Sequence, residues 1–212
     1  MNRPHVIINC AMSLDGKIAS QSGRQMKISC EEDIKRMYEL RNDSDAVLIG
    51  IGTVLSDDPK LTVKEKYIKN PKQPIRIVLD TYCRTPIDSL VVNDTAKTLV
   101  IIGKDCNKKF LNNVELIKCK IDEKGLIDLE NLIQILKDKG IKKLMVEGGS
   151  TVIGSFLKSN LVDDMFVYVA PMIIGGINTP TLVKNIDENI NLKLVETKKI
   201  GLGILLHYRL IK

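Results

Sequence analysis

The stretch Leu144-Met-Val-Glu-Gly-Gly-Ser-Thr151 decides the fold class. Its apolar start, residues 144–146, predicts a short buried strand, and the glycine pair after Glu147 ends that strand. A helix is predicted to follow as far as about Ser159, with Ser150 as its cap. A strand that passes through glycines straight into a helix is typical of α/β proteins.

The same order of elements extends along the chain on both sides. Six further apolar runs are predicted strands, and they span residues 5–11, 46–49, 75–79, 98–102, 114–119 and 165–169. A helix is predicted over residues 30–42, because Ser29-Cys-Glu-Glu32 has the form of a capping box. Another is predicted from the cap Asp128 through Lys139, where Gly140 ends it.

Alternating strands and helices predict a mainly parallel central sheet with helices on both of its faces. The last two strands, near residues 192–199 and 203–211, are predicted to form an antiparallel hairpin at the sheet edge. The chain has 212 residues, which suits one domain at about 150 residues per domain. The stretch 64–74 contains prolines and is predicted to be an exposed loop, so residues 1–212 are expected to form one domain.

The charge balance is 32 basic against 26 acidic residues, a net charge of +6. Nucleic-acid binding is one interpretation, but tryptophan is absent and no basic helix carries interleaved aromatic residues. Scattered lysines more often form a solvated surface, and a modest positive field also suits a phosphate-bearing substrate or cofactor. We therefore expect no nucleic-acid partner, and keep a basic RNA- or nucleotide-binding module as the alternative.

Five cysteines and two histidines are scattered without the short spacings that a zinc site needs, so no metal is expected. An odd number of dispersed cysteines predicts reduced thiols that serve as small core residues. No apolar run of 18 residues and no signal-peptide pattern is present. These features predict a cytoplasmic protein without a membrane span.

Two glycine-containing segments are candidate anion cradles: Gly50-Ile-Gly52-Thr53 and Gly148-Gly149-Ser150-Thr151. Each follows a strand and leads into a helix, so backbone N–H groups would point at a bound anion. Both lie at the carboxyl ends of strands, where open α/β sheets bind ligands. Neither has the GxGxxG or GxxxxGK[ST] form, and either segment alone is equally typical of a tight turn.

Three charged side chains are candidates for the same pocket. Glu147 ends an apolar strand, and an unpaired buried carboxylate would be costly there, which favours a pocket role. Arg41 is the last residue on the apolar face of its helix, where it either extends to solvent or holds a phosphate as a bidentate donor. Asp57 is either a ligand-binding residue or part of a helix stop with Asp58 and Pro59.

Several motifs in fixed order carry a family resemblance. They are Asn9-Cys-Ala-Met-Ser-Leu-Asp-Gly-Lys17, Ser22-Gly23, Arg41, Gly52-Thr-Val-Leu-Ser-Asp-Asp-Pro-Lys-Leu-Thr62, Glu147-Gly148-Gly149 and Pro171-Met-Ile-Ile-Gly-Gly176. In this order the chain resembles the reductase family of riboflavin biosynthesis over residues 3–211, and within it the stand-alone archaeal branch. The resemblance implies a dihydrofolate-reductase-like fold, a homodimer, and NADPH as the cofactor, with NADH as a further option.

The resemblance also implies roles for individual residues. Cofactor contacts are implied for Thr53, Asp57, Leu79, Asp80, Thr81, Tyr82, Ile127, Gly148, Gly149, Ser150 and Thr151, the last four around the pyrophosphate. Substrate contacts are implied for Asn9, Arg41, Leu61, Lys64 and Glu147. Lys64 stands where bacterial relatives often carry an arginine, and Asn9 stands where they commonly carry a lysine. No proton donor is identified, and Asp57 and Glu147 are the candidates.

The expected substrate follows from the same resemblance. The zinc deaminase signature H-x-E with P-C-x-x-C is absent, so the substrate is expected to keep its 2-amino group. That substrate is 2,5-diamino-6-ribosylamino-4(3H)-pyrimidinone 5′-phosphate, reduced at C1′ of the ribosyl group to the ribitylamino product. The deaminated 5-amino-6-ribosylaminouracil 5′-phosphate is the alternative. Asn9 or Glu147 can accept hydrogen bonds from pyrimidine amino groups, which a lysine cannot do.

Overall fold

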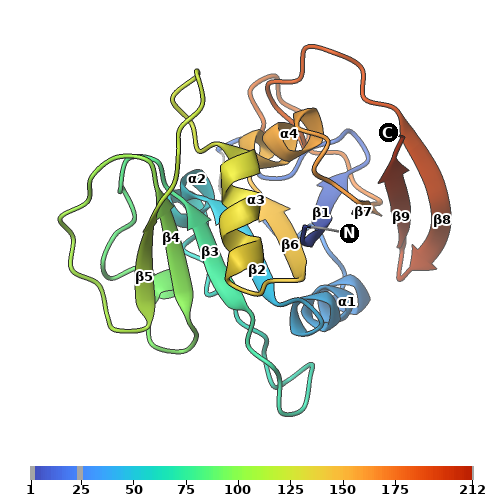
Figure 1. Cartoon of the computed structure of the whole chain (residues 1–212). Coiled ribbons are helices and arrows are strands. Elements are labelled where there is room, and N and C mark those ends of the chain that lie inside the picture. The colour runs from blue at the N-terminus through green and yellow to red at the C-terminus, as the bar shows by residue number, and fades with distance from the viewer. Residues whose placement is uncertain (1–2, 23–25, 212) are drawn as a thin grey trace.

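A computed structural model describes residues 3–22 and 26–211, and its strands form one sheet (Figure 1). The strands are β1 (His5–Ser13), β2 (Ala46–Gly50), β3 (Ile75–Leu79), β4 (Thr98–Ile102), β5 (Val114–Lys118), β6 (Lys143–Gly148), β7 (Asp164–Ala170), β8 (Leu192–Ile200) and β9 (Gly203–Leu210). The helices are α1 (Glu31–Asn42), α2 (Ile51–Asp57), α3 (Leu129–Asp138) and α4 (Ser150–Lys158), with a short 3-10 helix η1 (Leu90–Val92). Gly23 of the Ser22-Gly23 motif lies outside the described residues.

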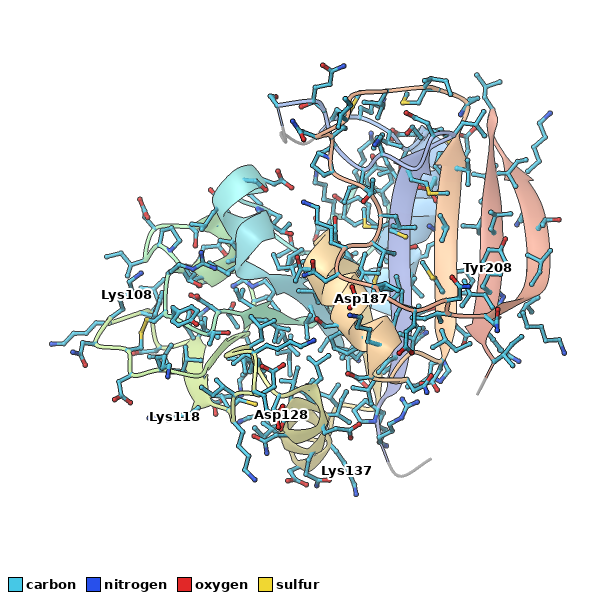
Figure 2. All side chains as sticks on the ribbon, turned by 90° about the horizontal axis from the view of Figure 1, so that it is seen from above. Lys108, Lys118, Asp128, Lys137, Asp187 and Tyr208 are labelled. Atoms are coloured by element: carbon cyan, nitrogen blue, oxygen red, sulfur yellow. A yellow bond between two sulfur atoms is a disulfide. The ribbon has the colours of Figure 1, made fainter. Side chains whose placement is uncertain are left out.

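The strand order is β5-β4-β3-β2-β6-β1-β7-β9-β8. In this spatial order, every pair of neighbours from β5 through β4, β3, β2, β6 and β1 to β7 is parallel. Strand β9 runs antiparallel to β7, and β8 runs antiparallel to β9. Figure 2 shows the sheet from above, with Lys118 of the edge strand β5 on one side and Tyr208 of β9, next to the other edge strand β8, on the opposite side. The predicted α/β fold with a C-terminal antiparallel hairpin is therefore confirmed.

Successive side chains along the buried strands point to opposite faces of the sheet and pack into two separate cores. On β2, Ala46 and Leu48 pack with α3 and α4, while Val47 and Ile49 pack with α1 and α2. Each of these four side chains is essentially fully buried, worth about 1.5–3 kcal/mol for a valine, leucine or isoleucine. Helices therefore cover both faces of the sheet, as predicted.

The helix caps are partly as predicted. The Asp128 carboxylate accepts a hydrogen bond from the backbone of Asn131 at 3.0 Å, so the predicted cap of α3 is confirmed. The predicted capping box of α1 is wrong, because Cys30 is its N-cap and no side chain caps it. Ser150 does not cap α4, because the extended residue Gly149 takes that place and the Ser150 hydroxyl donates to the Thr181 carbonyl.

The cysteines depart from the prediction of uniformly reduced thiols. Cys83 and Cys106 form a disulfide, whereas Cys10, Cys30 and Cys119 are free. Cys83 follows β3 and Cys106 follows β4, and these strands are parallel neighbours. Their following loops therefore lie side by side, a proximity that the separation of 23 residues in sequence did not indicate.

An arginine lies inside the sheet, where the sequence indicated an apolar strand. Arg76 on β3 is fully buried, and its guanidinium donates to the side chains of Thr98 and Asn93 and to the carbonyls of Asn93 and Ala96. Burial lowers the pKa of Arg76 to about 10. The guanidinium thereby ties the segment after η1 to the sheet.

The two ends of the described chain meet at neighbouring carboxylates. His5 and His207 both hydrogen-bond Asp164, at 2.8 and 2.6 Å. Arg3 forms a bidentate pair with Asp163, both bonds at 2.8 Å. The first and last strands are thus joined beside β7.

Within residues 3–22 and 26–211, no helix is long and apolar enough to cross a membrane.

Candidate functional site

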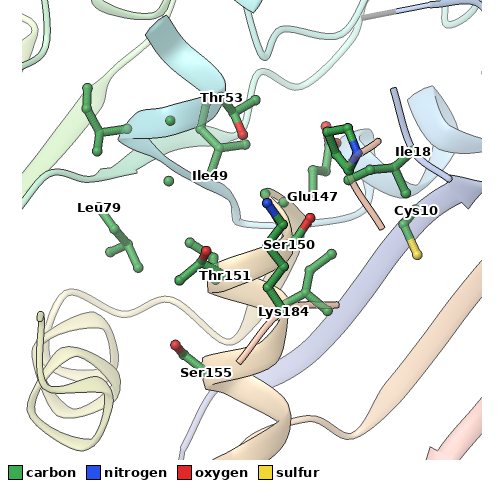
Figure 3. Close-up of a pocket in the computed structure, with 18 of the residues that line it drawn as sticks. Cys10, Ile18, Ile49, Thr53, Leu79, Glu147, Ser150, Thr151, Ser155 and Lys184 are labelled. Carbon is green, nitrogen blue, oxygen red and sulfur yellow. The ribbon is translucent and has the colours of Figure 1, made fainter. Parts of the chain in front are cut away.

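A cavity of about 1340 Å³ opens at the carboxyl ends of the parallel strands, as predicted for an open α/β sheet. Ile49 and Gly50 of β2, Leu79 of β3 and Gly148 of β6 contribute to its wall. The first turns of α2 and α4 border it, and Figure 3 shows Thr53, Glu147, Ser150 and Thr151 around the opening.

The structure brings most of the predicted site residues together in this one cavity. The lining includes Thr53, Asp57, Leu79, Thr81, Tyr82, Ile127, Gly148, Gly149, Ser150 and Thr151 of the expected cofactor set. It also includes Arg41, Leu61 and Glu147 of the expected substrate set. Asp80, Asn9 and Lys64 are not among the lining residues.

Helices α2 and α4 differ from the other two in how they begin. Each has a glycine N-cap, Gly50 or Gly149, with no side-chain cap and no acidic residue in the first turn. By contrast, α1 has three acidic residues in its first turn and α3 has Glu130 there. Acidic side chains compensate the positive end of a helix. The start of α4 is left uncompensated where it faces the cavity, an arrangement suited to a bound anion.

The glycine pair shapes the wall between these helices. Gly148 has a φ of +140°, and a Cβ there would meet nothing within 4 Å, so its place faces open space in the cavity. A Cβ on Gly149 would lie 3.3 Å from Thr53 Oγ1. The peptide bond between the two glycines is cis. Because neither glycine has a side chain, this segment offers bare backbone to a ligand, as the cradle hypothesis requires.

Arg41 and Glu147 form a bidentate ion pair inside the cavity wall. Arg41 Nε and Nη2 each lie 2.6 Å from a different Glu147 oxygen, and Nη1 donates to the Thr62 carbonyl at 3.0 Å. The two side chains are only 11% and 13% exposed. Burial works to lower the pKa of Arg41, but the adjacent Glu147 carboxylate outweighs it and the pKa lies above its ordinary value. From the sequence, the Arg41 guanidinium is a candidate bidentate donor to a phosphate, but in the structure Glu147 accepts both of these hydrogen bonds.

The walls beside this ion pair are largely apolar. Cys10 and Ile18 lie on the Glu147 side of the cavity (Figure 3), and Ile28, Met37 and Leu61 also line it. Burial raises the pKa of the Cys10 thiol to about 12, so the thiol stays protonated and is not a nucleophile at neutral pH. A flat heterocycle with polar edges suits such a surface: apolar walls with one charged pair.

Two segments that carry the family resemblance are joined by hydrogen bonds to Asp15. The Asp15 carboxylate accepts hydrogen bonds from the Ser13 hydroxyl and from the backbone N–H groups of Ile174 and Gly175. These bonds, the one from Ser13 foremost, lower the pKa of Asp15 to about 2. Asp15 thereby anchors the turn that leads to Ile18, which lines the cavity.

Three predicted site residues have other surroundings. Asp80 is fully buried, its Oδ2 accepts from the backbone and hydroxyl of Thr85, and its Oδ1 has no hydrogen-bond partner among the described residues. The Asn9 side-chain oxygen accepts from Arg36 on α1 at 2.7 Å. Lys64 lies on an exposed loop with its Nζ 5.9 Å from the centre of the Tyr38 ring. Their contacts to ligands remain predictions.

The structure also adds residues that sequence reasoning missed. Basic side chains on the cavity wall are Lys27, Arg84, Lys124, Lys158 and Lys184. They come from loops and a helix end without a shared motif, so no local pattern could have singled them out.

Comparison with protein families assigns nearly the whole chain to one family. The family model described as the RibD C-terminal domain matches residues 4–206. The chain is 38% identical over 209 residues to a protein of Archaeoglobus fulgidus named 2,5-diamino-6-ribosylamino-4(3H)-pyrimidinone 5′-phosphate reductase, covering 95% of each chain. It is 40% identical over 213 residues to the protein of that name from Methanothermobacter thermautotrophicus, covering 97% of this chain and 98% of that one.

Solved structures show the same architecture. A deaminase/reductase of Thermotoga maritima superposes with a TM-score of 0.84 at 26% identity, covering 99% of this chain and 57% of that one. Dihydrofolate reductase from Enterococcus faecalis superposes with a TM-score of 0.53 at 12% identity, covering 98% of this chain and 97% of that one. The dihydrofolate-reductase-like fold implied by the resemblance is confirmed.

Proposed function

The chain belongs to the RibD C-terminal domain family, and from this membership we propose that it reduces 2,5-diamino-6-ribosylamino-4(3H)-pyrimidinone 5′-phosphate with NADPH. The ribosylamino side chain would become ribitylamino by reduction at C1′. The observation that carries the proposal is the match over nearly the full length of two archaeal relatives that bear this name. The bifunctional relative, in contrast, is matched over 57% of its chain.

The wall around α4 fits a dinucleotide. Bare backbone at Gly148 and Gly149, the uncapped start of α4 and the Thr53 hydroxyl would hold its diphosphate. Tyr82 and Ile127 line the part of the cavity expected to face its adenosine. When bound, the reduced nicotinamide supplies the hydride. The size of the cavity, about 1340 Å³, leaves room for a second ligand beside the cofactor.

The part of the cavity around Arg41 would then bind the pyrimidine. Each Glu147 oxygen accepts one bond from Arg41 and keeps a further lone pair, which can accept from an amino group of the diamino substrate. Arg41 fixes the carboxylate in place, and the apolar walls exclude water. Because Glu147 is engaged by Arg41, we assign it to substrate binding and keep Asp57, at the end of α2, as the candidate proton donor.

A homodimer is part of the same proposal. The edge strand β8 is exposed along nearly its whole length, and Leu194 and Val195 on it are 49% and 44% exposed. Packing against a second subunit would remove the apolar surface of Leu194 and Val195 from water.

The test is a steady-state assay that follows oxidation of NADPH, and of NADH in parallel, with the diamino and the deaminated pyrimidine phosphates. We expect turnover of the diamino compound, with NADPH preferred. Preference for the deaminated compound would instead assign the alternative substrate. Absence of NADPH binding together with tight binding of single-stranded RNA at physiological salt would overturn the reductase assignment.

A further inference from the structure

Lys184 lies on the loop between β7 and β8, and this loop is pressed against the start of α4. Its backbone N–H donates to the Ser150 carbonyl at 3.3 Å. Its own carbonyl packs so closely on Gly154 that a Cβ at Gly154 would strike it. These contacts fix the backbone of Lys184 on α4, so its side chain starts from a defined position.

The side chain runs along the first turn of α4 into the cavity. Figure 3 shows the Lys184 ammonium at the start of that helix, near Ser150. Across the described part of the chain it has no hydrogen-bond or ion-pair partner. Lys158, at the other end of α4, differs because it pairs with Asp187 at 2.7 Å.

The exposed Lys184 ammonium lies at the positively charged end of a helix. The start of a helix carries a partial positive charge, which repels a cation. No acidic residue in the first turn of α4 offsets it, and Gly149 provides no side-chain cap. An anion seated between the Lys184 ammonium and the free N–H groups of α4 would interact favourably with both.

We propose that Lys184 is a diphosphate-binding residue, whose ammonium pairs with the diphosphate of the nicotinamide cofactor. This assignment rests on the proposed function. Gly149, Ser150 and Thr151 present backbone to the diphosphate from the helix side, and Lys184 approaches it from the loop side. The other anion that could enter the cavity is the 5′-phosphate of the pyrimidine, and the experiment separates the two.

The experiment compares Lys184→Met and Lys184→Arg with the wild-type protein. The Lys109→Met variant is the control, since Lys109 is exposed on the loop between β4 and β5, outside the cavity lining, and carries the same charge. The Kd of NADPH is measured without substrate, by quenching of its fluorescence, at several salt concentrations. Melting temperatures check that each variant is folded.

We expect Lys184→Met to raise the Kd of NADPH by about 10- to 100-fold, the value of a charge-assisted hydrogen bond. We also expect it to weaken the salt dependence of the Kd, because one screened ion pair is lost. Lys184→Arg should restore most of the affinity, and Lys109→Met should leave it unchanged.

Three results would overturn the assignment. An unchanged Kd in Lys184→Met would show that the ammonium does not contact the cofactor. A higher KM for the pyrimidine with an unchanged Kd of NADPH would assign Lys184 to the substrate phosphate instead. Failure of the wild-type protein to bind NADPH would overturn the proposed function together with the assignment.

Discussion

Breaking the Arg41–Glu147 ion pair should destabilise the protein in a way that a double-mutant cycle can resolve. In Glu147→Gln the amide keeps one acceptor for Arg41 but turns an NH₂ group toward the second guanidinium nitrogen. Removing one partner of a buried ion pair costs about 3–5 kcal/mol. Both side chains border an open cavity at 11% and 13% exposure, so we expect a cost at or just below the lower end of that range, about 2–3 kcal/mol.

The cycle uses Arg41→Met, Glu147→Gln and the double variant, each unfolded in urea and followed by circular dichroism. Each single variant leaves the other charge unpaired, whereas the double variant leaves neither. The double variant should therefore be little less stable than either single one, with a coupling energy of about 2 kcal/mol or more. At this chain length the melting temperature should fall by about 2–4 °C per kcal/mol.

Additive destabilisation within about 0.5 kcal/mol would refute the reasoning, because it would mean that the two side chains do not act as a pair. Ligand binding provides the second readout. Glu147→Gln should lower kcat/KM for the pyrimidine by about tenfold or more, while the Kd of NADPH changes much less. Equal losses in both would place Glu147 against the cofactor or show a purely structural role.

Three further predictions concern other parts of the molecule. Gly149→Val should raise the Kd of NADPH strongly, because an added Cβ would lie 3.3 Å from Thr53 Oγ1 and the methyl groups beyond it would enter the cavity. Gly149→Ala should raise the Kd less, and an unchanged Kd in Gly149→Val would contradict the cradle. Asp15→Asn should flatten the acid side of the stability profile: the pKa of Asp15 is about 2 in the folded protein against an ordinary value of 3.8, so its contribution is complete above that ordinary value and is lost as pH falls toward 2. Urea unfolding from neutral to acid pH checks this, and an equally steep decline in both proteins would refute it. Arg76→Met should lower the free energy of unfolding by about 3–5 kcal/mol, because the carbonyls of Asn93 and Ala96 lose their buried donor; a loss below about 1 kcal/mol would mean that water replaces the guanidinium.

The sequence predicted the strands and helices well, because their apolar residues repeat with clear periods. Strands β3 and β4 match the predicted residues 75–79 and 98–102. Their order in the sheet was not accessible in the same way, since pairing such as that of β1 with β6 joins residues far apart in the chain. The Cys83–Cys106 disulfide was missed for the same reason.

The site was predicted best where it is built from consecutive residues. The run Gly148–Thr151 follows a strand, so its place at the carboxyl edge was foreseeable. Side-chain direction was harder to predict: Asn9 and Cys10 are neighbours on β1, yet only Cys10 lines the cavity while Asn9 binds Arg36. Lys184 depends on where a long loop returns to α4, which no local pattern encodes.

The position of β1 has a consequence for the order in which the molecule can fold. This strand precedes the other strands of the sheet in sequence, but it lies in the middle of the sheet between β6 and β7, which come from residues 143–148 and 164–170. Strands β2 to β5 are contiguous in sequence and adjacent in space, so this half of the sheet can assemble from local contacts. The other half closes only after its partners have left the ribosome, and contacts over such sequence separations form slowly. Until then β1 exposes apolar side chains and unpaired backbone, a combination that favours aggregation.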